Sequence, residues 1–203
     1  TSSKMKLKAL SQNANGLQQK GHFFKFLQVL SEWCRRGEFQ VALIQEHNFD
    51  PSTLKDRIRL AQIKGFHAVI SCAPPKVKQD GSAHYPGGTM ILIYEKEVTY
   101  ISTTTSEPGL TQVVCSHQGF EHQFACIYAP ASPLKRVDFY KELKKDYTPS
   151  STQLTENTIL GGDFNNVDDV TLDVQSPNPT RYKNIGSDLM NEAISSYNLF
   201  DLR

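Results

Sequence analysis

The segment 159–166, with the sequence ILGGDFNN, places an aspartate and two asparagines after a short apolar run and two glycines. Ile159 and Leu160 have the character of a buried strand end, so Asp163 and Asn165 would stand where that strand stops. A carboxylate can hold and deprotonate a water molecule. An amide can hydrogen-bond a phosphoryl oxygen without adding negative charge. The segment therefore holds groups of the kinds that chemistry on a phosphate would use.

Three further apolar runs end in polar residues of similar kinds. They are followed by Asn13 and Asn15, by Glu46, His47 and Asn48, and by Tyr128. If neighbouring strands point these ends the same way, one edge collects amides, two carboxylates and a phenol. Magnesium prefers oxygen ligands, often one or two carboxylates, with water and substrate oxygens completing its octahedron. The set therefore suits a hard cation together with a phosphate.

Each of these clusters, taken alone, has an ordinary structural explanation. Asn15-Gly16 is typical of a turn, and a Gln-Glu pair is typical of a solvated surface. Tyr128 followed by alanine and proline is typical of a strand terminus. The clusters gain weight because all four follow strand-like apolar runs, in one order along the chain.

The elements that would position these residues alternate between strands and helices. The apolar patterns predict strands at 5–13, 39–45, 66–71, 89–95, 111–117, 122–128 and 156–162. They predict helices at 22–36, 51–64, 134–147 and 187–200, the last capped by Ser187. The run at 39–45 is continuously apolar, which indicates a strand covered on both faces. The segments 72–88 and 165–184 read as loops.

Length and composition restrict the class of protein. A chain of 203 residues and 22.8 kDa is long enough for one domain with a sizeable core. The formal net charge of +1 excludes a histone-like polycation. It allows a local basic surface, since phosphate binding depends on where the charges lie.

The cysteines and the start of the chain indicate a reducing compartment. No two of Cys34, Cys72, Cys115 and Cys126 have the spacing of a metal-binding pair, which favours reduced and mostly buried thiols. No run approaches eighteen apolar residues, so we expect no membrane span. The first ten residues lack an apolar secretory core and favour an intracellular protein, although a cleaved signal peptide would leave the same start.

Five motifs in order resemble those of a known family. SQNANGL, LIQEHNF, GGTMILI, IYAPAS and ILGGDFN resemble successive motifs in the endonuclease domain of LINE-type (non-LTR) retrotransposons. That domain belongs to the endonuclease/exonuclease/phosphatase superfamily, which also contains apurinic/apyrimidinic endonucleases. The resemblance extends from about residue 6 to residue 203. It implies an α/β fold, a four-layer sandwich of two packed mixed sheets flanked by helices, forming one domain over 1–203.

The resemblance also implies a Mg²⁺-dependent phosphodiesterase, with Mn²⁺ as a possible substitute, that nicks duplex DNA and starts target-primed reverse transcription. The implied roles are metal binding by Glu46, placement of metal and phosphate by Asn13, contact with the scissile phosphate by Tyr128, activation of water by Asp163, and phosphoryl-oxygen binding by Asn165. Three neighbouring residues are expected to contact the nucleic acid, namely Asn15, His47 and Asn48.

The chain departs from the family at its end. The family continues with further strands and a terminal Ser-Asp-His motif, whereas this sequence stops at Arg203. None of its histidines stands in that context, and His47 is interpreted as a residue at the rim of the site. We therefore expect a domain that is incomplete at its C-terminus and lacks its last strands. A reverse transcriptase region of the same polyprotein and access to the nucleus are implied as well.

Two other classes of function stay open. Another phosphohydrolase of the superfamily, such as an abasic-site repair endonuclease, an RNA deadenylase, or an inositol- or sphingomyelin-phosphate hydrolase, would carry similar motifs. A nucleic-acid-binding module without catalysis would also be compatible with the missing histidine. Nicking assays on intact and abasic duplexes, with metal titration, would separate these classes.

Overall fold

The computed structural model describes residues 6–145, 158–166 and 186–196. These residues divide between two compact units. The first contains residues 1–128 and 159–162, and the second contains 129–158 and 163–203. Each unit is described by itself. The predicted loop over 167–184 and the predicted end of the last helix, 197–200, lie outside the described residues.

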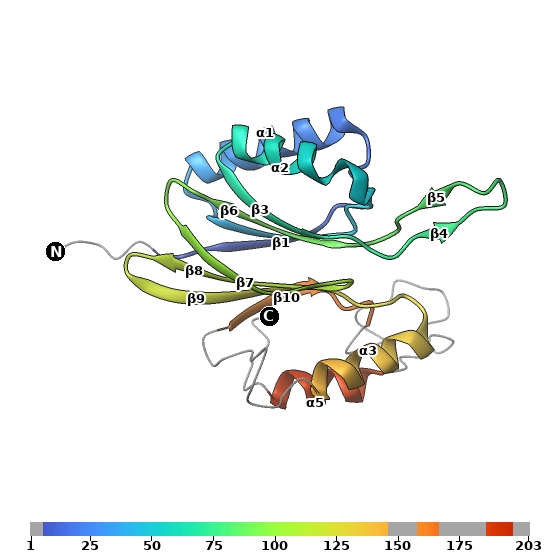
Figure 1. Ribbon diagram of the computed structural model, residues 1–203. Coiled ribbons are helices and arrows are strands. Elements are labelled where there is room, and N and C mark those ends of the chain that lie inside the picture. The colour runs from blue at the N-terminus through green and yellow to red at the C-terminus, as the bar shows by residue number, and fades with distance from the viewer. Residues whose placement is uncertain (1–5, 146–157, 167–185, 197–203) are drawn as a thin grey trace, which may run out of the picture. The chain divides into compact units, whose positions relative to one another are not determined.

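The first unit is built on a four-stranded mixed sheet (Figure 1). Its strands, in spatial order, are β1 (Ala9–Asn13), β2 (Val41–Gln45), β6 (Thr89–Tyr94) and β3 (Phe66–Ser71). β1 and β2 run parallel, while β6 runs antiparallel to both of its neighbours. The ends of β1, β2 and β3 therefore meet the start of β6 at one edge. The register confirms this, because Gln45 pairs with both Asn13 and Thr89.

Two helices cover one face of this sheet, as Figure 1 shows. They are α1 (Lys20–Arg35) and α2 (Leu54–Ile63), the latter preceded by a short 3-10 turn, Pro51–Thr53. α1 buries Phe23, Leu27, Leu30 and Cys34, at the spacing of one helical face. Both helices are followed by a glycine with positive φ, Gly37 and Gly65. The predicted helices at 22–36 and 51–64 are thus confirmed within a few residues.

A second sheet packs on the other face of the first. Its order is β10 (Thr158–Asp163), β9 (Phe120–Tyr128), β8 (Leu110–His117) and β7 (Thr99–Glu107), and residues 159–162 of β10 belong to this unit. Leu43 and Ile91 of the first sheet share a core with Val113 and Phe124 of the second. Because helices cover one face of β2 and a sheet covers the other, all five of its residues are buried. The predicted α/β class with two packed sheets flanked by helices is confirmed.

Two segments differ from the sequence prediction. β7 lies in a stretch for which no strand was predicted, and its residues are mostly exposed, so no hydrophobic period marks it. The segment 72–88, predicted as a loop, contains a hairpin of β4 (Lys76–Val77) and β5 (Ala83–His84). This hairpin extends well beyond the end of the sheet in Figure 1.

The described helices are all too short or too polar to cross a membrane.

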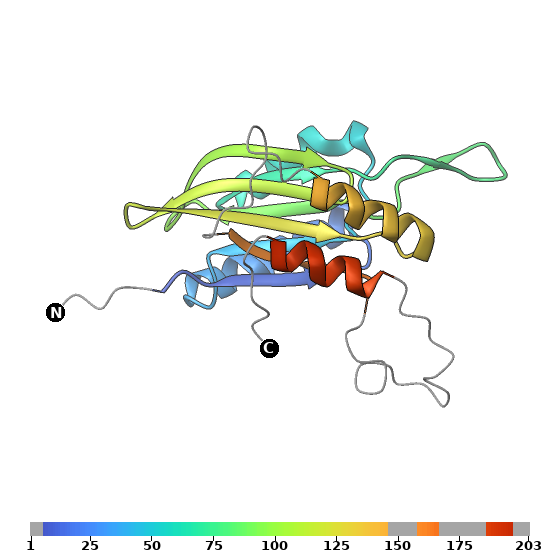
Figure 2. The same cartoon turned by 90° about the horizontal axis from the view of Figure 1, so that it is seen from below.

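The second unit contains a pair of helices. α3 (Pro133–Lys145) and α5 (Ser187–Ser196) pack against each other, as Figure 2 shows. Ser187, predicted as the cap, is the first residue of α5, and the helix is preceded by Gly186 with a φ of +100°. The predicted helix at 134–147 is confirmed over its described part.

The two glycines of ILGGDFNN allow the backbone of β10 to approach its neighbours closely. A Cβ added at Gly162 would collide with the carbonyl oxygen of Ile127 on β9. A Cβ at Gly161 would lie 2.7 Å from a side-chain carbon of Leu43 on β2. The pair is therefore required for packing within the first unit.

We expect Gly162→Ala to lower the free energy of unfolding by about 3 kcal/mol or more, because backbone must move to admit the methyl group. Gly21→Ala is a matched control, since a Cβ at Gly21 meets nothing within 4 Å and α1 gains helix propensity. Urea unfolding of both variants measures the effect. Equal stability of the two would contradict the close approach.

Candidate active site

Three loops at one edge of the first sheet are joined by backbone hydrogen bonds. We call the segments 13–17, 46–48 and 87–88 the polar edge. Gly16 donates its N–H to the Glu46 carbonyl at 2.8 Å, and Leu17 donates to the His47 carbonyl at 2.9 Å. Glu46 in turn donates to the Gly88 carbonyl at 2.9 Å. These bonds connect the three loops and hold the predicted site residues within 13–15 and 46–48 at the edge of the sheet.

Glu46 directs its carboxylate toward the end of β9. The Tyr128 hydroxyl donates a hydrogen bond to Glu46 Oε1 at 3.1 Å. The backbone of Glu46 is in the left-handed region, with a φ of +59°. Gly87, with a φ of +108°, leaves room for the phenol, because a Cβ there would lie 2.7 Å from the Tyr128 ring. The structure thus brings Glu46 and Tyr128 together from two different sheets.

Asn13 and Asn15 form a turn at the polar edge. The Asn15 N–H donates to Asn13 Oδ1 at 2.9 Å, and Asn15 has a φ of +47°. Both residues are exposed. The turn that explains this pair structurally also places Asn13 beside Gln45, one residue before Glu46. The structural and the chemical interpretations are therefore compatible.

The structure contradicts the prediction that His47 lies at the rim of the site. The side chain is fully buried, with 0% of its surface exposed. Its Nδ1 accepts the Phe49 N–H at 3.0 Å, so the ring proton resides on Nε2, which donates to the Ser71 carbonyl at 3.0 Å. The prediction that His47 contacts nucleic acid is wrong, because the chain turns its ring inward against Gly88 and Phe49.

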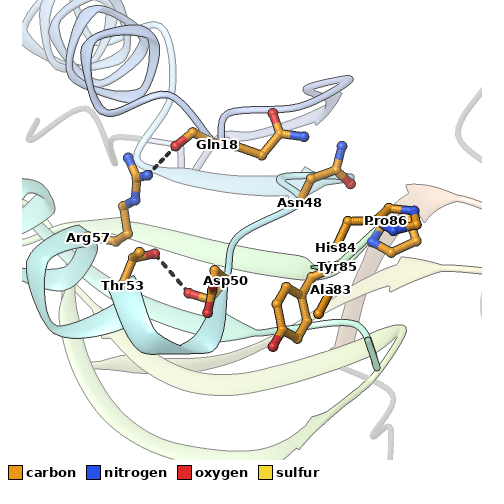
Figure 3. A pocket seen from close by; sticks show the side chains of 9 residues that line it. All are labelled: Gln18, Asn48, Asp50, Thr53, Arg57, Ala83, His84, Tyr85 and Pro86. Atoms are coloured by element: carbon orange, nitrogen blue, oxygen red, sulfur yellow. Dashed lines mark hydrogen bonds between the residues drawn. The ribbon is translucent and has the colours of Figure 1, made fainter. Parts of the chain in front are cut away.

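A pocket of about 230 Å³ opens beside Asn48 (Figure 3). It is lined by Gln18, Asn48, Asp50, Thr53, Arg57 and the residues 83–86. The Arg57 guanidinium donates to the Gln18 carbonyl and lies 4.7 Å from the centre of the Phe49 ring. Asn48 accepts a hydrogen bond from the Gly87 N–H. The contact of Asn48 and Asn15 with nucleic acid stays a prediction.

In the second unit, Asp163 and Asn165 belong to a turn that closes on Ala129. The Asn165 N–H donates to Asp163 Oδ1 at 2.9 Å, and Asn165 Nδ2 donates to the Ala129 carbonyl at 2.7 Å. The Ala129 N–H donates to the Asp163 carbonyl at 2.8 Å. Asp163 and Asn165 thus share one hydrogen-bonded turn. Their convergence with Glu46 stays a prediction, because Glu46 belongs to the other unit.

Sequence reasoning missed Tyr140, which supports this turn. Its hydroxyl donates to the Phe164 carbonyl at 2.7 Å, and only 1% of the residue is exposed. Burial raises the pKa of the Tyr140 phenol above its usual value, so the hydroxyl keeps the proton that it donates. Sequence analysis placed Tyr140 only within the helix predicted at 134–147.

Known structures share this arrangement of strands and helices. The chain is similar to the endonuclease domain of TRAS1, a telomere-specific non-LTR retrotransposon, at 16% identity and a TM-score of 0.56, covering 97% of this chain and 75% of that one. An AP endonuclease from Archaeoglobus fulgidus matches at 15% identity and a TM-score of 0.56, over 95% and 70% of the two chains. An endonuclease/exonuclease/phosphatase family protein from Leptotrichia buccalis matches at 16% identity and a TM-score of 0.54, over 97% and 74%.

The chain has the endonuclease/exonuclease/phosphatase fold. The fold implied by the sequence motifs is therefore confirmed. No family model and no curated protein sequence matches the chain. The likeness lies in the three-dimensional arrangement.

Within this endonuclease/exonuclease/phosphatase fold, the donor atoms at the polar edge fit a hard cation. Among the described residues, no group of three or more His, Cys, Asp and Glu side chains could hold a metal ion. Mg²⁺ needs only one or two carboxylates, since water and phosphate oxygens complete its shell. Glu46 supplies a carboxylate of this type, and the Asn13 amide supplies a further oxygen, because Asn13 pairs with Gln45, the residue before Glu46.

Burial of His47 predicts a pH-dependent stability. Burial lowers its pKa from 6.5 to about 4, and the positive charge of Arg57 acts in the same direction. The unfolded chain therefore binds the proton more tightly between these values, and stability falls as the pH falls. The stability associated with the neutral form of His47 is fully present above pH 6.5, and it is lost as the pH falls from 6.5 through about 4.

We expect the free energy of unfolding to lose on the order of 3 kcal/mol from this group between pH 7.5 and pH 4. Urea unfolding across this range measures the loss. A His47→Gln variant should show a shallower pH dependence, whereas His22→Gln, which changes an exposed histidine, should follow the wild-type slope. Identical slopes for all three proteins would refute the assignment.

Proposed function

We propose that this chain is a metal-dependent phosphodiesterase, the DNA-nicking endonuclease domain of a non-LTR retrotransposon. The observation that carries the proposal is the hydrogen bond from Tyr128 to the Glu46 carboxylate at the polar edge. It joins two residues that the sequence motifs assigned to one site. The likeness to the endonuclease domain of TRAS1 and the order of the five motifs support the retrotransposon class.

The chemistry follows from what each side chain can bind. Glu46 would hold Mg²⁺ or Mn²⁺, and the cation would offset the charge that builds on the phosphoryl oxygens. Asn13 accepts the Asn15 N–H through Oδ1, and its Nδ2 is the kind of group that would donate to a phosphate oxygen. Asn165 would bind a phosphoryl oxygen, and Asp163 would take a proton from the attacking water. Tyr128 would contact the scissile phosphate.

The proposed substrate is duplex DNA. A nick in a target duplex leaves a strand end from which reverse transcription can start. A reverse transcriptase region of the same polyprotein, and access to the nucleus, belong to this proposal. Asn15 and Asn48 flank the turns of the polar edge and are the proposed contacts to the nucleic-acid backbone.

Incubation with supercoiled plasmid tests this function. We expect conversion to the open-circular form with Mg²⁺ or Mn²⁺ and none with a chelator. Absence of nicking under all metals, together with absence of Mn²⁺ binding by calorimetry, would overturn the proposal. Mn²⁺ binding without nicking would instead favour a nucleic-acid-binding module.

An abasic-site endonuclease is the second candidate. The AP endonuclease from Archaeoglobus fulgidus matches with the same TM-score as the TRAS1 domain. The two candidates differ in substrate. A duplex with one abasic site should be cut much faster than an intact duplex by a repair enzyme, and at a similar rate by a retrotransposon endonuclease.

A further inference from the structure

We propose that His47 is a positioning residue, which together with Gly88 holds the Glu46 carboxylate in the orientation that binds the cation. The assignment of the cation to Glu46 rests on the proposed function. The role of His47 rests on the geometry of the polar edge. The buried ring does not face a substrate, so it would act only through the backbone on either side of it.

The backbone around His47 needs such support. Glu46 and Asn48 both adopt the left-handed conformation, with φ values of +59° and +57°. This conformation costs free energy for residues other than glycine, and it persists only where the surroundings determine it. His47 is the residue between them. Whatever fixes the position of His47 therefore also fixes the direction in which the Glu46 side chain points.

The two hydrogen bonds of the His47 ring fix that position. Nδ1 accepts the Phe49 N–H at 3.0 Å and so spans the left-handed residue Asn48. Nε2 donates to the Ser71 carbonyl at 3.0 Å, which ties the loop to the last residue of β3. Both partners are backbone groups, so neither can rotate away. The ring connects the loop that follows β2 with the end of a strand on the far side of β6.

Gly88 provides the space for the ring and a bond to Glu46. A Cβ at Gly88 would lie 2.5 Å from His47 Nε2 and 2.8 Å from the Ser71 carbonyl oxygen. The Gly88 carbonyl also accepts the Glu46 N–H at 2.9 Å. A side chain at position 88 would therefore displace the ring and disturb the bond that holds Glu46.

Two substitutions separate this role from simple packing. His47→Phe fills the space but removes both hydrogen bonds. His47→Asn fills less space but keeps an acceptor, Oδ1, near the place of Nδ1 and within reach of the Phe49 N–H. If the ring only packs, the phenylalanine variant retains metal binding and the asparagine variant loses it. If the bonds position Glu46, the phenylalanine variant loses more metal affinity than the asparagine variant, which keeps the bond to Phe49 and loses only the bond to Ser71.

The first readout is the dissociation constant for Mn²⁺, measured by calorimetry. We expect His47→Phe to weaken binding at least about ten-fold, as loss of groups that orient a ligand does, and His47→Asn to stay within about three-fold of wild type. Gly88→Ala should weaken binding as His47→Phe does, and it serves as the second variant if His47→Phe does not fold. Leu30→Ala, a destabilising change in the core beneath α1, is the control for lost stability and should leave Mn²⁺ binding unchanged.

The second readout needs no metal. The Gly16 and Leu17 amides donate to the carbonyls of Glu46 and His47, so their hydrogen exchange reports the loop directly. We expect exchange at least about ten-fold faster in His47→Phe and near wild type in His47→Asn, with Val113 of β8 unchanged in both.

The results distinguish a failure of the role proposed for His47 from a failure of the proposed function. Wild-type Mn²⁺ affinity in His47→Phe, or equal losses in the phenylalanine and asparagine variants, would overturn the role of His47. A comparable loss in Leu30→Ala would do the same. If the wild type binds no Mn²⁺, or if Glu46→Gln binds it equally well, the proposed function fails instead, and the amide exchange alone decides whether His47 holds the loop.

Discussion

Asp163→Asn is expected to slow Mg²⁺-dependent nicking by about a hundred- to ten-thousand-fold while leaving Mn²⁺ binding at Glu46 intact. The reason is that an amide cannot take the proton of the attacking water, and a general base contributes an effect of about that size. The amide oxygen can still accept the Asn165 N–H that Asp163 Oδ1 accepts at 2.9 Å, so the turn should survive. Initial rates on supercoiled plasmid measure the loss.

Asp138→Asn is the matched control for this experiment. Asp138 is an exposed aspartate on α3, in the same unit as Asp163, and its replacement removes the same charge. Its nicking rate should equal that of the wild type. If both variants nick at the wild-type rate, Asp163 is not the base, and the interpretation of ILGGDFNN as a catalytic segment is wrong.

Glu46→Gln is expected to weaken Mn²⁺ binding by about a hundred-fold or more and to reduce nicking in step with lost metal occupancy. The substitution keeps the shape of the side chain and an oxygen that can accept the Tyr128 hydroxyl, but it removes the carboxylate charge. Affinity for hard cations depends strongly on the number of charged oxygen ligands. Calorimetry with Mn²⁺ and nicking over a metal titration measure the two effects.

Glu38→Gln provides the comparison, because Glu38 is exposed in the loop between α1 and β2, before the start of that strand, whereas the polar edge follows its end. It should bind Mn²⁺ and nick as the wild type does. Partial recovery of nicking by Glu46→Gln at high Mn²⁺ would support loss of affinity as the cause. A rate that metal concentration does not affect would argue that Glu46 has another role.

The parts of the fold that the sequence predicted include those with two-sided burial or a single apolar helical face. β2 and β6 are buried at every position, because each contacts helices on one side and a sheet on the other. Continuous apolar runs follow from that environment. α1 shows one apolar face for the corresponding reason.

The parts that the sequence did not predict have no such signature. β7 is largely exposed, so threonine and serine occur on both of its faces. Its sequence therefore lacks the alternation of apolar and polar residues that marks a half-buried strand. The sequence prediction for His47 was wrong because the sequence around a histidine that follows a strand does not show whether the ring points into the core or toward solvent. Its burial depends on Gly88 and Ser71, which are distant in sequence and approach it only through the pairing of β2, β6 and β3.

The left-handed backbone at Glu46 has a consequence for how the sequence can evolve. Four residues other than glycine adopt this conformation in the predicted site segments, and three of them are asparagine, the residue that tolerates it best: Asn15, Glu46, Asn48 and Asn165. Glutamate is the exception in this set. A library randomised at position 46 and sorted for folding alone would therefore enrich asparagine and glycine at the expense of the natural residue. At position 46 the local preference of the backbone and the proposed need for a carboxylate therefore favour different residues, and a second sort for Mn²⁺ binding should restore glutamate.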